Sequence, residues 1–164
     1  MPGTKEGTTK EGTTKGRTTR RTFIAGAALV SVLPLASARA TPETMAAAIK
    51  EVVGENVVRE GRVTLDLPPL IENGNAVPLT VSVESPMSDA DHVKAIHVFN
   101  EKNPQPHVFD TRLGPRNGKA VIATRIKLGD SQKIVAIAET SKGEFFSASA
   151  DVIVTLAACL EDLT

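Results

Sequence analysis

The chain contains no tryptophan and no tyrosine, and it has only five phenylalanines among its 164 residues. Proteins that bind nucleic acids neutralise phosphates with basic side chains, and those that bind single strands also stack bases on aromatic rings. Residues 1–40 hold seven of the Lys and Arg and two of the Asp and Glu, which leaves twelve basic against seventeen acidic side chains, a net charge of minus five, in residues 41–164. An acidic domain without Trp or Tyr excludes nucleic-acid binding as its function.

Cysteine is also scarce, because Cys159 is the only one in the chain. A single cysteine cannot form an intramolecular disulfide, so the apolar core must stabilise the fold. Lone cysteines most often pack as small apolar residues, and that alternative stays open here. Cys159, however, follows a β-branched segment and has only five residues after it, and chain ends are usually exposed. We therefore expect residues 157–164 to form an arm that presents the thiol to solvent.

No apolar run is long enough for a membrane span. The apolar stretch at residues 23–35 is shorter than the roughly 20 residues that a spanning helix needs. Arg20 and Arg21 precede this stretch, and small residues suited to cleavage follow at 38–40. The pattern predicts a twin-arginine signal peptide over residues 1–40 and a periplasmic mature protein without a membrane span. A membrane anchor is the weaker alternative.

A five-residue repeat of Thr, Lys, Glu and Gly fills residues 4–18 and offers no apolar side chain to bury. Such a composition predicts disorder. The folded part is then one domain over residues 41–156, followed by the arm, and it is large enough to bury an apolar core of its own.

A short helix is predicted at the start of this domain. Thr41 can cap it, and the Pro-Glu pair that follows suits its first turn. One apolar face recurs at helical spacing, and Gly54 can end the helix in a left-handed conformation. The face consists of Met45, Ile49, Val52 and Val53.

After Arg62 the apolar period changes to two, which predicts half-buried strands. Residues 72–75, which are of types that tolerate positive φ angles, are expected to lie in the connection between the first two strands. The gaps between later strands hold only turns, too short for the helical crossovers of a parallel sheet. We therefore predict an all-β, immunoglobulin-like sandwich preceded by the helix. The predicted strands are residues 63–67, 77–83, 94–99, 107–113, 120–128, 134–139, 144–148 and 151–156.

Several short motifs occur in a characteristic order along the domain: KNPQP at 102–106, ATRIKL at 123–128 with Ser-Gln at 131–132, AIAE at 136–139, and VIVT at 152–155 before the cysteine. Together with the export signal and the helix, they resemble the SoxY family of periplasmic thiosulfate oxidation. The resemblance implies a sulfur carrier with an immunoglobulin-like domain, no cofactor, and a SoxZ subunit as its partner.

The arm departs from the pattern that the resemblance implies. In typical members glycine pairs flank the terminal cysteine, whereas here Ala157 and Ala158 precede it and Leu160 and Glu161 follow it. The arm resembles a SoxY-related variant with an Ala-Ala-Cys-Ile-Glu sequence. Because alanine rarely adopts positive φ, we expect a stiffer and thicker arm that fits a narrow, glycine-shaped channel poorly. The acidic residues after Cys159 also disfavour its thiolate.

Two functions follow from these observations. In the first, Cys159 carries sulfur intermediates covalently between periplasmic redox enzymes. In the second, the protein is an accessory or binding subunit of a periplasmic redox system, such as a quinoprotein dehydrogenase, and its arm docks non-covalently. Self-association, through the helix face, a sheet edge or a disulfide at Cys159, is a further prediction.

Independent catalysis has little support in the sequence. His92, His97 and His107 show no metal-ligand spacing, so neither a metal site nor a catalytic residue is predicted. His97 lies between two apolar residues and is predicted to be a hydrogen-bonded strand histidine. Arg125 is predicted to lie on an exposed strand face.

Overall fold

The structure is a computed structural model, and it describes residues 40–158. The repeat at residues 4–18 and the predicted export signal lie outside the described residues. So does most of the predicted arm. The predicted site residues outside the described part are Arg20, Arg21, Cys159, Leu160 and Glu161.

The predicted helix is present as α1, Pro42–Val53. The hydroxyl of Thr41 accepts the Thr44 backbone N–H at 3.3 Å, and the Thr44 hydroxyl accepts the Thr41 N–H at 2.7 Å. This reciprocal pair is a capping box in which a threonine replaces the usual Glu or Gln. Gly54 ends the helix with φ 61° and ψ −129°, so it uses the positive φ that glycine tolerates without being in the left-handed helical region.

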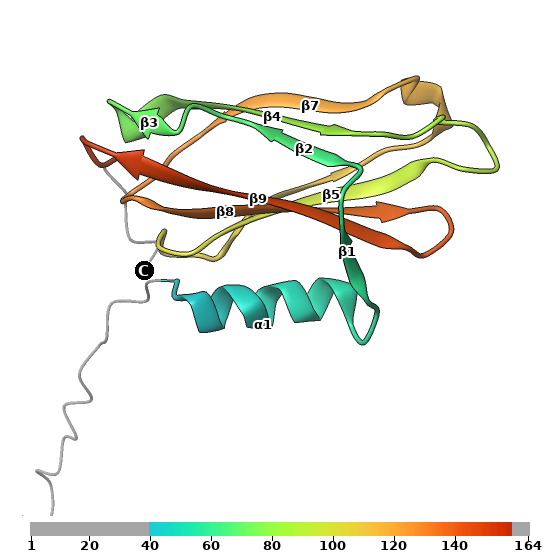
Figure 1. Ribbon diagram of the computed structural model, residues 1–164, viewed down its shortest axis with the longest axis horizontal. Coiled ribbons are helices and arrows are strands. Elements are labelled where there is room, and N and C mark those ends of the chain that lie inside the picture. Colours follow the sequence, from blue (N-terminus) through green and yellow to red (C-terminus); the bar gives the residue numbers. More distant parts are fainter. Residues whose placement is uncertain (1–39, 159–164) are drawn as a thin grey trace, which may run out of the picture. The chain divides into compact units, whose positions relative to one another are not determined.

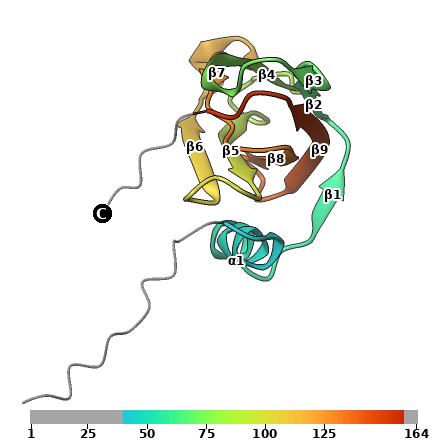
Figure 2. The same cartoon turned by 90° about the vertical axis from the view of Figure 1, so that its left-hand side faces the viewer.

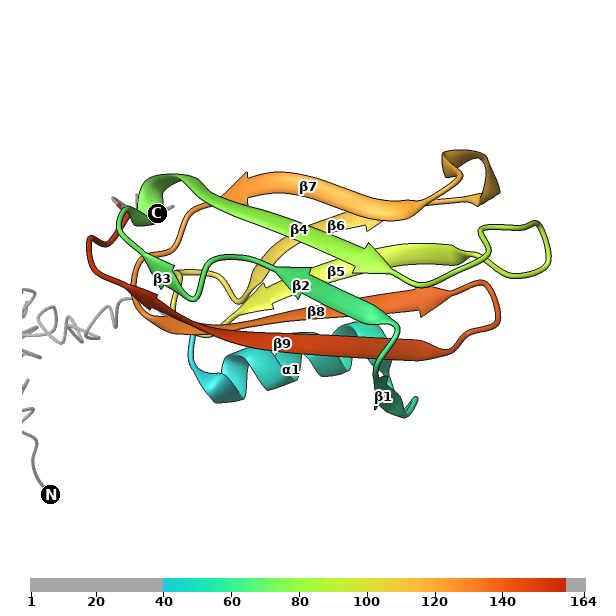
Figure 3. The ribbon, with the colours of Figure 1, turned by 45° about the horizontal axis from the view of Figure 1, so that its top comes forward.

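Nine strands are present among residues 40–158, and they form two sheets (Figure 1). The larger sheet has the order β1-β9-β8-β5-β6, with β3 pairing with β9, and the smaller has the order β2-β4-β7. The two sheets lie face to face as the layers of a sandwich (Figures 2 and 3). The strands are β1 Val58–Glu60, β2 Val63–Asp66, β3 Leu70–Ile71, β4 Val77–Val83, β5 Val93–Asn100, β6 His107–Arg112, β7 Ala120–Ile126, β8 Gln132–Thr140 and β9 Phe145–Val154.

The main core fills the space between the two sheets, as alternating strands require. On β4 every second residue from Val77 to Val83 is buried, and the residues between them are at least partly exposed. Ile96 and Val98 of β5 enter this core from the other sheet and are fully buried. The predicted all-β sandwich with a preceding helix is confirmed.

A second, smaller core lies on the outer face of the larger sheet. Met45 and Val53 of α1 pack there against Phe99, Ile137 and Phe145. The apolar helix face predicted from the sequence therefore covers the sheet of its own domain, and Figure 2 shows α1 on the side of the larger sheet away from the sandwich interior. No helix among residues 40–158 is long and apolar enough to cross a membrane.

The structure corrects the strand predictions at three places. Residues 144–148 and 151–156 are not separate strands, because Ser149 and Ala150 between them pair with β8 and β9 runs through. Strands β1 and β3 were not predicted, since three and two residues are too few for an apolar period to be read. Both pair in parallel with β9, which lies between them and β8 in the larger sheet.

Candidate functional site

The chain leaves β9 through a segment that is fixed by backbone hydrogen bonds as far as Ala158. Thr155 donates its N–H to the Ile71 carbonyl at 2.9 Å, and the Leu156 carbonyl accepts the Gly74 N–H at 2.8 Å. Ala158 donates its N–H to the Leu128 carbonyl at 3.0 Å. We call Gly74, Leu128 and residues 155–158 the arm root. The arm root holds the last described residue before Cys159 against the sandwich.

Gly74 is needed in the arm root because of space. A Cβ atom at this position would lie 2.2 Å from the Leu128 carbonyl oxygen and 2.8 Å from the Ala158 nitrogen. Both atoms belong to the backbone, so neither can move aside as a flexible side chain would. Residues 72–75 are of types that tolerate positive φ, as the sequence indicated, but none of them adopts a positive φ. The glycine permits three chain segments to approach one another.

A network of side-chain amides holds the chain on both sides of Leu128 in the arm root. Asn103 donates from Nδ2 to the Lys127 carbonyl at 2.8 Å, and its Oδ1 accepts the Gly129 N–H at 3.0 Å. These two bonds bracket Leu128, which in turn accepts from Ala158. The Gln132 side chain donates to Asn103 Oδ1 at 3.0 Å and accepts the Lys102 N–H at 2.9 Å. The motifs at 102–106, 123–128 and 131–132 thus meet in one place and position the loop that holds the arm root.

The two predicted arm residues within the described part differ in environment. Ala157 is exposed, whereas Ala158 is half-buried and hydrogen-bonded. The hydrogen bond of Ala158 attaches this end of the predicted arm to the sandwich.

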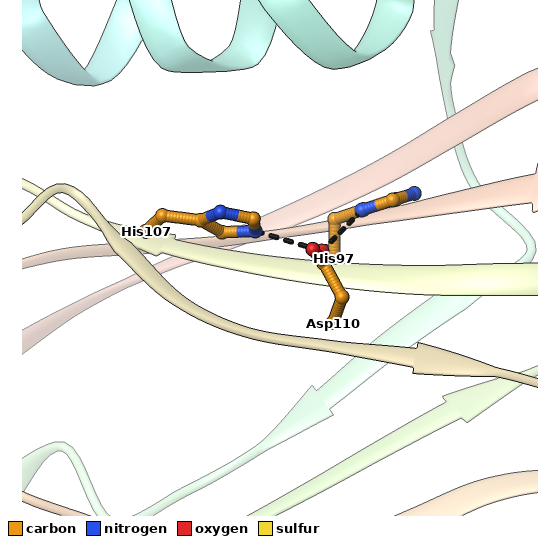
Figure 4. A group of neighbouring side chains, drawn as sticks. All are labelled: His97, His107 and Asp110. Carbon is orange, nitrogen blue, oxygen red and sulfur yellow. Dashed lines mark hydrogen bonds and ion pairs between the residues drawn. The ribbon is translucent and has the colours of Figure 1, made fainter.

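A second group of chemically active side chains lies on the outer face of the larger sheet (Figure 4). His97 Nδ1 and His107 Nε2 both hydrogen-bond to Oδ1 of Asp110, the latter at 2.7 Å. A carboxylate can only accept, so each ring donates an N–H to the shared oxygen. The three ligand-capable atoms lie within 4.8 Å of one another. We call His97, His107 and Asp110 the histidine cluster.

The surroundings of the histidine cluster restrict its side chains. His97 is only 13% exposed, and its Nε2 has no hydrogen-bond partner within residues 40–158. The His107 ring stacks on Phe99, with ring centroids 4.8 Å apart and planes inclined by 12°. Partial burial alone would raise the pKa of Asp110, but the hydrogen bonds from His97 and His107 outweigh it and hold this pKa below its ordinary value.

A β-bulge explains why the sequence did not reveal the histidine cluster. Residues three apart in a regular strand point to opposite faces, so His107 and Asp110 should not meet. Val98 and Phe99 of β5 pair with Phe109 and His107 of β6, which leaves Val108 as the extra residue. The bulge turns His107 to the face that carries Asp110. His97 is the hydrogen-bonded strand histidine that was predicted, and that prediction is confirmed.

The other residues considered from the sequence lie apart from both groups. The ring of His92 hydrogen-bonds to the Ser88 carbonyl through Nδ1 at 3.1 Å. Arg125 is exposed on β7, as predicted.

The architecture defines a class of proteins: a β-sandwich covered by one helix, in which the last strand leads through an anchored segment to a single cysteine near the chain end. Residues 49–159 match the family described as "Sulfur oxidation protein SoxY". This match covers more than half of the chain, and the chain belongs to the SoxY family.

Solved structures show the same fold. The sulfur carrier protein SoxY from Chlorobium limicola f thiosulfatophilum superposes with a TM-score of 0.59 at 24% sequence identity, over 70% of this chain and 98% of that chain. A superoxide reductase (neelaredoxin) from Ignicoccus hospitalis gives a TM-score of 0.52 at 16% identity, over 57% of this chain and 80% of that chain. No curated protein matches this sequence.

Proposed function

We propose that the protein is a sulfur carrier that holds sulfur intermediates covalently on Cys159. The observation that carries this proposal is the extent of the SoxY family match, which runs through the arm root and ends on the single cysteine of the chain. In this proposal the protein bears the substrate and does not catalyse its conversion. Family membership favours this function over the non-covalent accessory subunit.

The loading step needs only a sulfane-sulfur donor. The Cys159 thiolate attacks the outer sulfur of a persulfide or polysulfide, a new S–S bond forms, and the donor's S–S bond breaks with the electron pair leaving on the donor thiolate. The attacking thiol loses its proton to solvent. No further oxidant is required, because the sulfane sulfur is passed on without net oxidation.

The anchored arm root supports a short carrier arm. Ala158 is hydrogen-bonded to Leu128, so a thiol on the next residue is delivered from a fixed point on the sandwich. Leu160 and Glu161 occupy positions where typical members have glycine, and they give this arm a bulkier and more acidic end. We propose that these side chains select enzymes with wider or more basic entrances than those that accept glycine arms.

The setting that we propose is the periplasm, reached by the twin-arginine pathway through Arg20 and Arg21. The proposed partners are a SoxZ-like subunit and periplasmic redox enzymes. Strands β1 and β6 end the larger sheet and β2 and β7 end the smaller, and such end strands are candidate pairing edges for a partner. Self-association is the competing outcome, and non-reducing electrophoresis with size-exclusion chromatography separates a disulfide dimer from a complex of two different subunits.

The experiment is the replacement of Cys159 by serine in the native host. A carrier cannot function without the thiol, so Cys159→Ser should abolish sulfur-dependent growth while the protein is still exported and folded. The matched control is Ser149→Ala, which removes an exposed hydroxyl from β9 and leaves the thiol and the arm root in place. Normal growth of the Cys159→Ser strain would contradict covalent carriage.

A further inference from the structure

The histidine cluster lies outside the arm and has no role in sulfur carriage as proposed above. Its three side chains come from β5 and β6, on the face of the larger sheet that also carries α1 (Figure 4). Imidazole nitrogens and carboxylate oxygens are ligands of divalent first-row transition metals, and two histidines with one carboxylate form a recognised ligand set.

We propose that His97, His107 and Asp110 form a binding site for a divalent first-row transition-metal ion, with Zn²⁺ as the simplest occupant. In this site His97 Nδ1, His107 Nε2 and one Asp110 oxygen are the protein ligands. Three protein ligands leave at least one coordination position for water or an external ligand.

The site is largely preorganised by its neighbours. His97 is held by its strand, with Ile137 of β8 on one side and Asp110 of β6 on the other. The His107 ring is held by its stacking on Phe99, which is itself fully buried. Both ring nitrogens already point at one carboxylate oxygen, so metal binding moves the proton of each neutral ring to its other nitrogen, His97 Nε2 and His107 Nδ1, and needs no rearrangement of the strands.

Metal binding requires a movement of Asp110, the exposed residue of the histidine cluster. Two nitrogens on a tetrahedral zinc lie about 3.3 Å apart, and the three cluster atoms are within 4.8 Å of one another. The Asp110 side chain is 48% exposed and can rotate to make room for the ion between the rings. The bulge at Val108 serves this arrangement, because without it His107 would face the sandwich interior.

The test is a titration of the full-length protein, freed of metal with a chelator, by Zn²⁺ in a calorimeter and by Co²⁺ in an absorption spectrometer. We expect one ion per chain and Co²⁺ ligand-field bands typical of mixed nitrogen and oxygen ligands. His107→Ala and Asp110→Asn should each weaken Zn²⁺ binding by about tenfold or more. The thermal midpoint of the wild type should rise with Zn²⁺ and that of the two variants should rise less.

Two controls exclude other sites. His92→Ala removes a histidine that lies apart from the cluster, and Cys159→Ser removes the thiol; both should bind Zn²⁺ as the wild type does. Absence of stoichiometric binding would overturn the proposal. Binding that persists unchanged in His107→Ala, or that is lost in His92→Ala or Cys159→Ser, would overturn it as well, because the ion would then be held elsewhere.

Discussion

The arm root and the histidine cluster are built in opposite ways. The arm root consists of backbone groups: Gly74, Leu128 and Ala158 meet through carbonyls and amides, with no room for a Cβ on the glycine. The histidine cluster consists of side chains that converge on one carboxylate oxygen from two strands. A site built from backbone is therefore broken by adding atoms or by removing its support, and a site built from side chains is broken by deleting them.

The largest effect on the arm root should come from Gly74→Ala. The added methyl group would clash with the Leu128 carbonyl oxygen, and overpacking of this kind costs about 1–3 kcal/mol or more in the free energy of unfolding. Urea unfolding of the two proteins measures this cost, and faster hydrogen exchange at the Ala158 amide should accompany it. The matched control is Gly114→Ala, because no atom lies within 4 Å of its added Cβ and its φ of −158° suits any residue. Equal stability of the two variants would contradict the steric account of Gly74.

Removal of the Asn103 side chain, which supports the arm root, should have the next largest effect on stability. Asn103→Ala leaves the Lys127 carbonyl and the Gly129 N–H without their partner, which costs about 1–3 kcal/mol where such groups are partly buried. The unfolding midpoint in urea should fall accordingly. Gln105→Ala is the control in the same loop, since Gln105 is exposed and the substitution keeps its backbone carbonyl, which accepts from Asn100 Nδ2. If Asn103→Ala were as stable as Gln105→Ala, the amide network would not be what positions Leu128.

The helix cap should have a smaller effect, and one that is separate from both sites. Thr41→Ala removes the hydroxyl that accepts the Thr44 N–H, which costs about 1 kcal/mol. Thr41→Ser keeps the hydroxyl and should retain most of the stability. Thermal unfolding followed by circular dichroism distinguishes the two variants, and equal losses in both would show that the cap does not stabilise α1.

The smallest effect is expected at the histidine cluster in metal-free protein. His107→Ala removes one hydrogen bond to a carboxylate that is about half exposed, and such surface pairs contribute about 0–1 kcal/mol. Urea unfolding in the presence of chelator measures this value. A loss of stability as large as that of Gly74→Ala would mean that His107 is mainly a packing residue. The histidine cluster would then be needed for stability in the same way as the arm root.

The sequence predicted local elements of the fold better than the contacts that form the arm root. The period-two pattern of β4 and the cap at Thr41 are local signals, and both predict the observed elements. The motif at 102–106 carried the family resemblance, but its structural role depends on Leu128 and Ala158, which only the fold brings together.

The histidine cluster was not predictable from local pattern. Regular alternation places His107 and Asp110 on opposite faces, and only the register of β5 against β6 reveals the bulge that reverses this.

Strand β9 was divided into two predicted strands because its apolar pattern is interrupted at Ser149, although the ladder with β8 continues there. In each case a contact between distant strands decided the outcome.

The central claim is that Cys159 carries sulfur covalently, and peptide mass mapping of protein isolated from its native host tests it most directly. No Lys or Arg lies between Lys142 and Cys159, so the tryptic peptide that begins at Gly143 contains the cysteine. The account predicts that, in cells oxidising reduced sulfur compounds, this peptide carries sulfur-containing mass that a reductant removes and that Cys159→Ser eliminates. A free, unmodified thiol on this peptide under every growth condition would contradict the account.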